Sequence, residues 1–121
     1  MRSAGLAVRG NPDARSFYYC YIGPDGSYGI NVYSNQSDSP TAKLSYGVSK
    51  AIHQGGGQSN TLAVVARGTT LELYVNMQLV NSVTTTTYSS GNVGVAAYSL
   101  LATDGSGSTE AAFSNAKAWK L

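Results

Sequence analysis

The stretch from Phe17 to Tyr33, FYYCYIGPDGSYGINVY, decides the fold class of this chain. It begins with mostly aromatic, strand-favouring residues, and later Tyr28, Ile30 and Val32 alternate with the residues between them. Alternation with period two is typical of a half-buried β-strand. Between the two parts stands Gly23 to Gly26, where Pro presets the second turn position and Gly is free to adopt positive φ. The stretch therefore predicts a β-hairpin.

Further strands are predicted on both sides of this hairpin, because the same alternation returns in segment after segment. A single sheet made of such strands would leave an apolar face in water, so we expect two packed sheets and almost no helix. The connection that contains the triple glycine allows one short helical turn, over Val48 to Ile52. The other predicted strands cover Leu6 to Arg9, Ala42 to Tyr46, Thr61 to Arg67, Leu71 to Val75, Gln78 to Thr85, Gly91 to Ser99 and Glu110 to Leu121.

The composition supports one all-β domain spanning residues 1–121 and excludes several classes. Charged residues make up 12% of the chain, and a solvent-facing helix needs charge on its outer face, so a helix bundle is excluded. The net charge of +2 comes from scattered groups, so we expect no nucleic-acid partner. No apolar run approaches the roughly 20 residues of a membrane span, so we expect no membrane insertion.

The chain has one cysteine, Cys20, and one histidine, His53. Cys20 therefore has no internal disulfide partner, and no cysteine metal cluster is available. A Ser-His-Asp site would have to use His53, which stands in a Gly/Gln-rich loop. We interpret His53 as a solvated loop residue.

Several motifs follow one another along nearly the whole chain. They are GLAVRGNP (Gly5 to Pro12), YYCYIGPDGSY (Tyr18 to Tyr28), NTLAVVARG (Asn60 to Gly68), LELYVN (Leu71 to Asn76), GNVGVAA (Gly91 to Ala97), and Phe113-Ser114-Asn115 followed by Trp119. In order and spacing these motifs resemble the concanavalin A-like lectin/glucanase superfamily, and they are similar to the jelly-roll modules of bacterial extracytoplasmic proteins, of the laminin-G-like and 3-keto-glycoside hydrolase-like kinds. The resemblance implies a two-sheet antiparallel jelly-roll sandwich and an extracellular or cell-surface location.

The chain departs from the family pattern in two places. Family members carry further strands before the segment that matches Gly5 to Arg9, so the resemblance implies that those first strands are missing. An open sheet edge recruits other strands, and symmetric dimers are the commonest oligomers, so we expect a homo-oligomer through that edge. The family also has Asn-Gly at a hairpin turn where this chain has Asn76-Met77, which leaves the turn type open because Met disfavours positive φ.

The resemblance and the alternation also assign the two faces of the hairpin. Tyr18, Cys20 and Ile22 are expected to point into the core, together with Leu6, Val8, Tyr28, Ile30 and Val32. Arg9, Tyr19, Tyr21, Asn31 and Tyr33 are expected to point outward. On the later strands the expected core residues are Leu62, Val64, Leu71, Leu73, Val75, Val93, Val95 and Phe113.

The residues that are expected to point outward predict a ligand-binding face. Tyrosine rings stack on the apolar faces of sugar rings, while Arg and Asn bond to hydroxyl groups. Arg9, Tyr19, Tyr21, Asn31 and Tyr33 would lie on neighbouring strands, so a non-catalytic carbohydrate-binding or adhesion module is the leading hypothesis. The alternative is a structural, self-associating domain without a small ligand, in which exposed tyrosines merely favour strands.

A glycan-active hydrolase-like domain is the third hypothesis. Retaining glycosidases need two carboxylates about 5 to 5.5 Å apart, usually from acids on one face of one strand. Only Glu72 and Glu110 fall in predicted strands, and neither has an acid two residues away. The remaining acids, all in predicted loops or turns, are Asp13, Asp25, Asp38 and Asp104.

Calcium is the one cofactor that the resemblance raises. Laminin-G-like relatives bind calcium through Asp and backbone carbonyls of loops, which Asp104 to Ser108 and Asn11 to Asp13 would supply here. Such clusters are more often plain turns, so the expectation is that no cofactor is bound.

Overall fold

The structure, a computed structural model, describes residues 2–11, 16–34, 40–55, 58–90 and 92–99. Within these ranges the chain forms eight β-strands and no helix. The strands are β1 (Arg2–Asn11), β2 (Ser16–Ile22), β3 (Ser27–Tyr33), β4 (Ala42–Val48), β5 (Leu62–Arg67), β6 (Thr70–Val75), β7 (Gln78–Thr84) and β8 (Asn92–Ser99).

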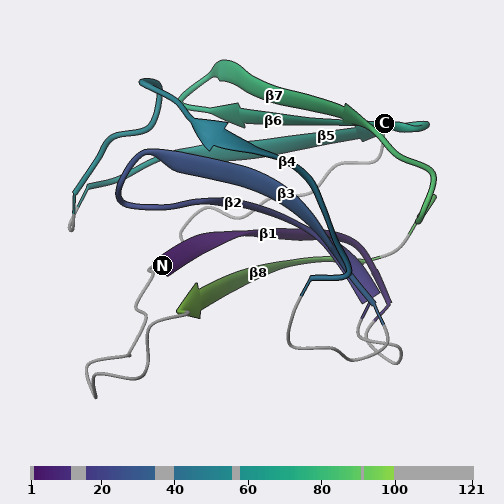
Figure 1. Cartoon of the computed structure of the whole chain (residues 1–121). Helices are drawn as coiled ribbons and strands as arrows, with labels where there is room; N and C mark the ends of the chain where they lie inside the picture. The colour runs from purple at the N-terminus through teal and green to yellow at the C-terminus, as the bar shows by residue number, and fades with distance from the viewer. Residues whose placement is uncertain (1, 12–15, 35–39, 56–57, 91, 100–121) are drawn as a thin grey trace.

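The strands form two antiparallel sheets, which lie one above the other in Figure 1. The larger sheet has the strand order β4-β3-β2-β1-β8, and the smaller has the order β5-β6-β7. The hairpin predicted from Phe17 to Tyr33 is β2 and β3, with Phe17 opposite Tyr33 and Ile22 opposite Tyr28. The prediction of an all-β chain with two antiparallel sheets is confirmed for the described residues.

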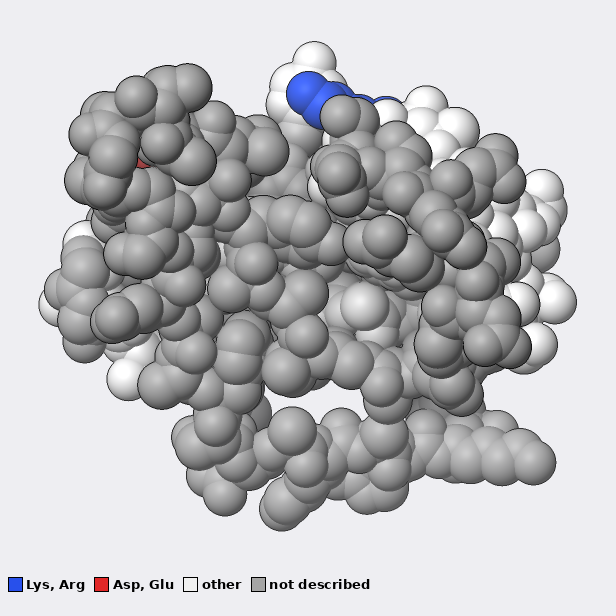
Figure 2. Space-filling model, turned by 90° about the horizontal axis from the view of Figure 1, so that it is seen from below, with Lys and Arg blue, Asp and Glu red and all other residues white. Residues whose placement is uncertain are grey.

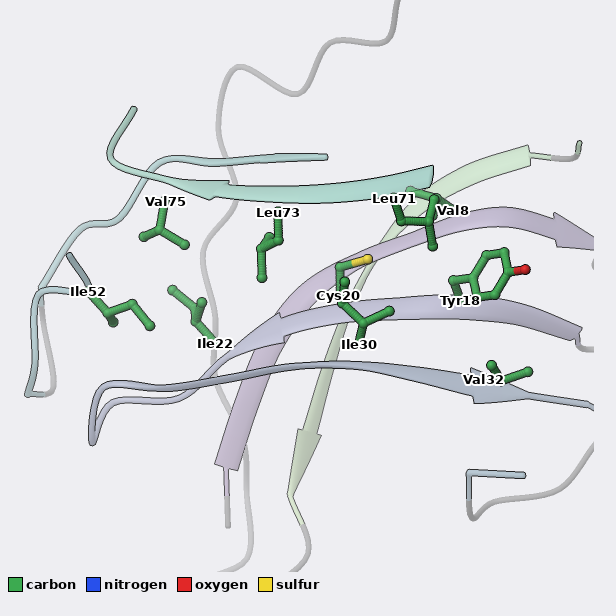
Figure 3. Close-up of a cluster of buried hydrophobic side chains, with 10 residues drawn as sticks. All are labelled: Val8, Tyr18, Cys20, Ile22, Ile30, Val32, Ile52, Leu71, Leu73 and Val75. Carbon is green, nitrogen blue, oxygen red and sulfur yellow. The ribbon is translucent and has the colours of Figure 1, made fainter. Parts of the chain in front are cut away.

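One hydrophobic core lies between the two sheets (Figure 3). The β6 side chains Leu71, Leu73 and Val75 are fully buried and meet those of β1, β2 and β3, while Leu62 and Val64 of β5 pack against them. The inward assignment of the first strands is therefore confirmed. Its buried members are Val8, Tyr18, Cys20, Ile22, Ile30 and Val32, with Leu6 and Tyr28 packed beside them. The predicted core positions Val93, Val95 and Phe113 are outside the side chains that the structure describes.

The connection between β4 and β5 closes one end of the core as a strap between the two sheets. The Ser49 N–H donates to the Gly26 carbonyl at 2.9 Å, in the β2–β3 turn. On the other sheet, Asn76 in the β6–β7 turn donates from Nδ2 to the Ala51 carbonyl at 2.8 Å. Ile52, the residue after Ala51, is buried in the core. Where the sequence allowed one helical turn, the strap has a single hydrogen-bonded turn, in which the Ile52 N–H donates to the Ser49 carbonyl at 3.4 Å, and no helix follows from it in the described residues.

The β6–β7 hairpin turns through Asn76 and Met77, and both residues have positive φ, 51° and 67°. Val75 and Gln78 pair directly on either side. Positive φ at both central residues is the signature of a type I′ turn, whose twist matches that of the strands it joins. The turn therefore keeps the geometry for which Asn-Gly is preferred, although Met77 stands at the second position.

Candidate functional site

The face of β2 and β3 that points away from the core carries a second aromatic cluster. It consists of Tyr19, Tyr21 and Tyr33, with Phe17 packed against them. The Tyr19 and Tyr21 rings stack at a centroid distance of 5.3 Å, and those of Phe17 and Tyr33 stack at 4.9 Å. The prediction that Tyr19, Tyr21 and Tyr33 share one face is confirmed, because residues two apart on a strand point the same way.

The expectation that these tyrosines are exposed is wrong. Tyr19 is 2% exposed, and Tyr21 and Tyr33 are also buried. Each ring packs on a neighbour, and Tyr21 also lies across Gly29 of β3, where an added Cβ would overlap its ring. The tyrosines therefore form a second, smaller apolar layer beneath the sheet rather than an open platform.

Asn31 is the polar residue of this layer and is 7% exposed. It pairs in register with Tyr19 on β2 and with Lys43 on β4. Burial raises the pKa of the Tyr21 hydroxyl, and a hydrogen bond with the Asn31 side chain offsets part of this rise. Among the described residues none donates a hydrogen bond to the buried Oδ1 of Asn31. An acceptor left in this state costs about 1–3 kcal/mol, so the layer has an unused polar group.

Ser3 of β1 adds a second polar contact to the layer. Its Oγ lies 3.1 Å from the Tyr19 hydroxyl oxygen, and both groups are buried. This hydrogen bond satisfies the Tyr19 hydroxyl and holds the ring against the sheet. The sequence reading missed Ser3, since a lone serine in a strand gives no signal of a cross-strand bond.

Arg9 does not lie beside the tyrosines, so its expected place on the outer face is wrong. The register of β1 shifts between Val8 and Asn11, and Arg9 has a φ of 52° within this irregularity. A bulge of this kind re-aims side chains. The guanidinium Nη1 of Arg9 donates to the Gly68 carbonyl at 2.8 Å and to the Tyr88 carbonyl at 3.2 Å. Arg9 thus ties β1 to the β5–β6 turn of the other sheet.

Two exposed residues of β4 lie on the same outer face, and the sequence reading missed both. Tyr46 is 72% exposed and pairs in register with Gly29, the residue that the Tyr21 ring covers. Lys43 is exposed and pairs with Asn31. Alternation along Ala42–Val48 would have placed Tyr46 on the same face as Leu44, which packs against the core. Only the register, with its shift between Ile30 and Asn31, places Tyr46 on the outer face next to the tyrosine layer.

Figure 2 views the molecule from the side of the five-stranded sheet. The described residues visible there are mostly neither acidic nor basic, and Lys or Arg atoms appear at one edge. A small part of a described acidic residue also appears at one end of this view. Of the described acids, Asp25 is in the β2–β3 turn, and Glu72 on β6 pairs with Val65 and Ser82. Among the described residues of β4 on this face, Tyr46 and Lys43 are exposed.

No group of three or more His, Cys, Asp or Glu residues that could hold a metal ion occurs in the described part of the chain. The loop Asp104 to Ser108 is outside that part, as are Pro12 and Asp13 of the other predicted calcium loop. The acids Asp13, Asp38, Asp104 and Glu110 are outside it as well. The calcium hypothesis therefore stays a prediction.

Neither the lone histidine nor the lone cysteine belongs to this face. His53 is exposed in the strap, where its Nδ1 lies 2.9 Å from the Ser59 carbonyl oxygen. Cys20 is fully buried in the main core, and burial raises the pKa of its thiol to about 12. A thiol with this pKa stays protonated at neutral pH, so Cys20 acts as a small core residue.

Comparison of the chain with family models, with curated proteins and with solved structures gave no match. Within the described residues, no helix is long and apolar enough to span a membrane.

Proposed function

We propose that this protein is a non-catalytic carbohydrate-binding or adhesion module of a secreted or cell-surface protein. In this proposal its two sheets form a jelly-roll sandwich of the concanavalin A-like kind, which its sequence motifs resemble. The fold class agrees with the proposal but does not select a function, because one fold serves many functions. The support for carbohydrate comes from the outer face of the five-stranded sheet.

The observation that carries the proposal is the exposed ring of Tyr46 at the border of the aromatic layer, with the exposed Lys43 on the same face. A sugar offers apolar C–H faces for an aromatic ring and hydroxyl groups for polar side chains, so it complements both features. Tyr19, Tyr21 and Asn31 are buried, so they form a floor beneath this face rather than the contact surface itself. Contact with the ligand then falls to the exposed residues that border this floor.

The test is a glycan array screened with the full chain, followed by titration of any glycan that binds. We expect weak binding, near millimolar, since a stacked ring and a few hydroxyl bonds leave little net free energy after ordering costs. Tyr46→Ala should weaken that binding at least tenfold. The absence of binding to every glycan on the array would reject the proposal.

The second candidate is the structural domain that associates with itself. The open edge expected beside Gly5 to Arg9 is not found among the described strands, because β1 pairs with β2 on one side and with β8 on the other. Another observation favours self-association. Among the described strands, β5 pairs only with β6, and all six of its residues pair without a bulge. The pairings of the other described edge strands, β4, β7 and β8, each carry a register shift, which is a usual defence against edge-to-edge pairing. A regular, weakly charged edge such as β5 is the one a second copy of this chain would extend.

Light scattering over a range of protein concentrations tests this candidate. We expect a dimer that dissociates on dilution, and Ala63→Lys on the exposed side of β5 should shift it to monomer, because a charged edge disfavours pairing. Ser82→Lys, at an exposed position of the bulged edge β7, is the matched control and should leave the dimer intact. A monomer at all concentrations would remove this candidate.

A further inference from the structure

Among the described strands, the two sheets do not overlap completely on the side of β5. Across the core β1 contacts β5 and β4 contacts β7, while β8 lies beyond β1 at the edge of the larger sheet. Leu62, Val64 and Ala66 of β5 pack against the core but stay partly exposed, whereas the inward side chains of β6 are fully buried. The smaller sheet therefore ends one strand short of the larger sheet on this side.

The edge of β5 that borders this opening is regular. All six residues of β5 pair with β6 in unbroken register. In an antiparallel pair, successive residues direct their N–H and C=O groups alternately toward the partner strand and away from it. Every second residue of β5 thus directs backbone groups away from β6, and no other described strand pairs with them. Such an edge recruits a further strand.

A single extended segment fits this opening better than a second sandwich does. If two β5 edges paired about a two-fold axis, the β8 of each copy would come to lie where the other copy has its β1, because both are one strand spacing from β5 in the same layer. A symmetric dimer through this edge therefore requires β8 to move. One added strand requires no such change.

The chain itself contains a segment of this kind, residues 110–121, for which the sequence predicts a strand and which lies outside the described residues. Four of its six odd-numbered residues are apolar, among them Phe113 and Trp119, so a strand would carry them on one face. The connection from Ser99 at the end of β8, residues 100–109, spans about 33 Å when extended. That exceeds the length of β5, about 20 Å, so the segment can reach the edge from either end.

We propose that residues 110–121 of this chain add to the edge of β5 and cover the core above β8. The apolar face of the segment meets Leu62, Val64 and Ala66, and its backbone bonds to the groups of β5 that point away from β6. The edge is then closed to other chains, so this inference opposes the second candidate function at the same edge. It is independent of the proposal for carbohydrate.

Hydrogen exchange of single amides in the full chain, followed by NMR, tests the inference. If the edge is free, only every second amide from Leu62 to Arg67 is protected, by its bond to β6; with the segment in place, the remaining amides are protected as well. We expect these to exchange at least tenfold more slowly than in Phe113→Asp, because a buried carboxylate would expel the segment. Ser114→Asp, on the opposite face of the predicted strand, is the matched control and should keep the protection.

The amides of β2 report whether each variant is folded, and light scattering of the same samples separates the occupants. Trp119→Ala, a milder change on the same face, replaces Phe113→Asp if that variant does not fold. Protection of the remaining β5 amides in a monomer, lost in the variant, supports the inference. Protection that occurs only in a dimer overturns it in favour of a second copy. Fast exchange of these amides in the wild type, or protection that survives in the folded variant, overturns it as well.

Discussion

At the scale of single residues, burial decides the chemistry of two side chains that would otherwise be reactive. The Cys20 thiol lies in the core with a pKa of about 12, and the Tyr21 hydroxyl has a raised pKa for the same reason. In both cases the charged form would have to exist where water is excluded. Neither group therefore offers a nucleophile at neutral pH.

We expect Cys20 to resist thiol reagents at pH 8 in the native protein and to react fully after denaturation. The sign of the pH effect follows from the raised pKa. The Cys20 thiol ionises near pH 8.5 to 9 in the unfolded chain but stays protonated in the folded protein. The contribution of Cys20 to the free energy of unfolding is therefore fully present below pH 8.5 and is lost as the pH rises toward 12. Urea unfolding of the wild type and of Cys20→Ala between pH 8 and 11 measures this contribution. If both proteins lose stability in parallel as the pH rises, the raised pKa of Cys20 would be contradicted.

Tyr18→Ala and Tyr21→Ala are both expected to destabilise the fold, by different amounts. Tyr18 is fully buried in the main core, and its hydroxyl lies 3.0 Å from that of Thr85, so its loss should cost about 3–5 kcal/mol. Tyr21 packs in the smaller outer layer, so about 1–3 kcal/mol is expected. Chemical denaturation measures both. An unchanged stability in Tyr21→Ala would mean that the outer layer is open in solution.

At the scale of secondary structure, hairpin turns and bulges decide where the strands direct their side chains. The β2–β3 turn is closed by a hydrogen bond from the Gly26 N–H to the Gly23 carbonyl, and Gly26 has a φ of 85°. The β5–β6 turn uses Gly68 at a φ of 57°. In both turns glycine adopts the positive φ without strain. The β6–β7 turn differs, because Met77 adopts positive φ with a side chain attached.

Met77→Gly is expected to stabilise the protein by about 1 kcal/mol. Met77 is 92% exposed, so the substitution removes little packing, while glycine relieves the left-handed backbone that a type I′ turn requires. Thermal unfolding measures the gain. Met77→Ala is the control: it removes the side chain beyond Cβ but keeps the strain, so it should give little or no gain. Equal stabilisation by both variants would contradict the turn assignment.

At the scale of the whole molecule, polar clamps at opposite ends hold the two sheets together. At one end Asn76 accepts a hydrogen bond at Oδ1 from the Thr61 N–H at 2.9 Å and donates to Ala51 in the strap. At the other end Arg9 bonds to the Gly68 and Tyr88 carbonyls. The core between them is apolar and non-directional, so the clamps fix how the sheets lie relative to each other.

The two clamps are expected to contribute independently. Arg9→Ala should cost about 1–3 kcal/mol through its two lost hydrogen bonds, and Asn76→Ala should cost at least as much, because it also places alanine at positive φ. The double variant should lose the sum within about 0.5 kcal/mol, since the sites share no contacts. Urea titrations of the three variants measure this. A marked departure from the sum would show that the ends are coupled through the core.

The sequence by itself determined the fold class and the inward face of the strands. Alternation along Tyr18, Cys20 and Ile22 follows from the two-residue repeat of a strand, and this repeat is a local property of the backbone. It also placed Tyr19 and Tyr21 together on the opposite face. It could not show that they are buried, because a repeat separates two faces without showing what packs against each.

Only the tertiary structure decided which of the outward residues could meet a ligand. The bulge in β1 turned Arg9 to the other sheet, and irregular backbone has no repeat from which its direction can be read. Strand register set Tyr46 beside Gly29 and Lys43 beside Asn31, although these partners are more than ten residues apart in the chain. Register arises from long-range pairing and from bulges, so the site on β4 could be seen only once the strands were in place.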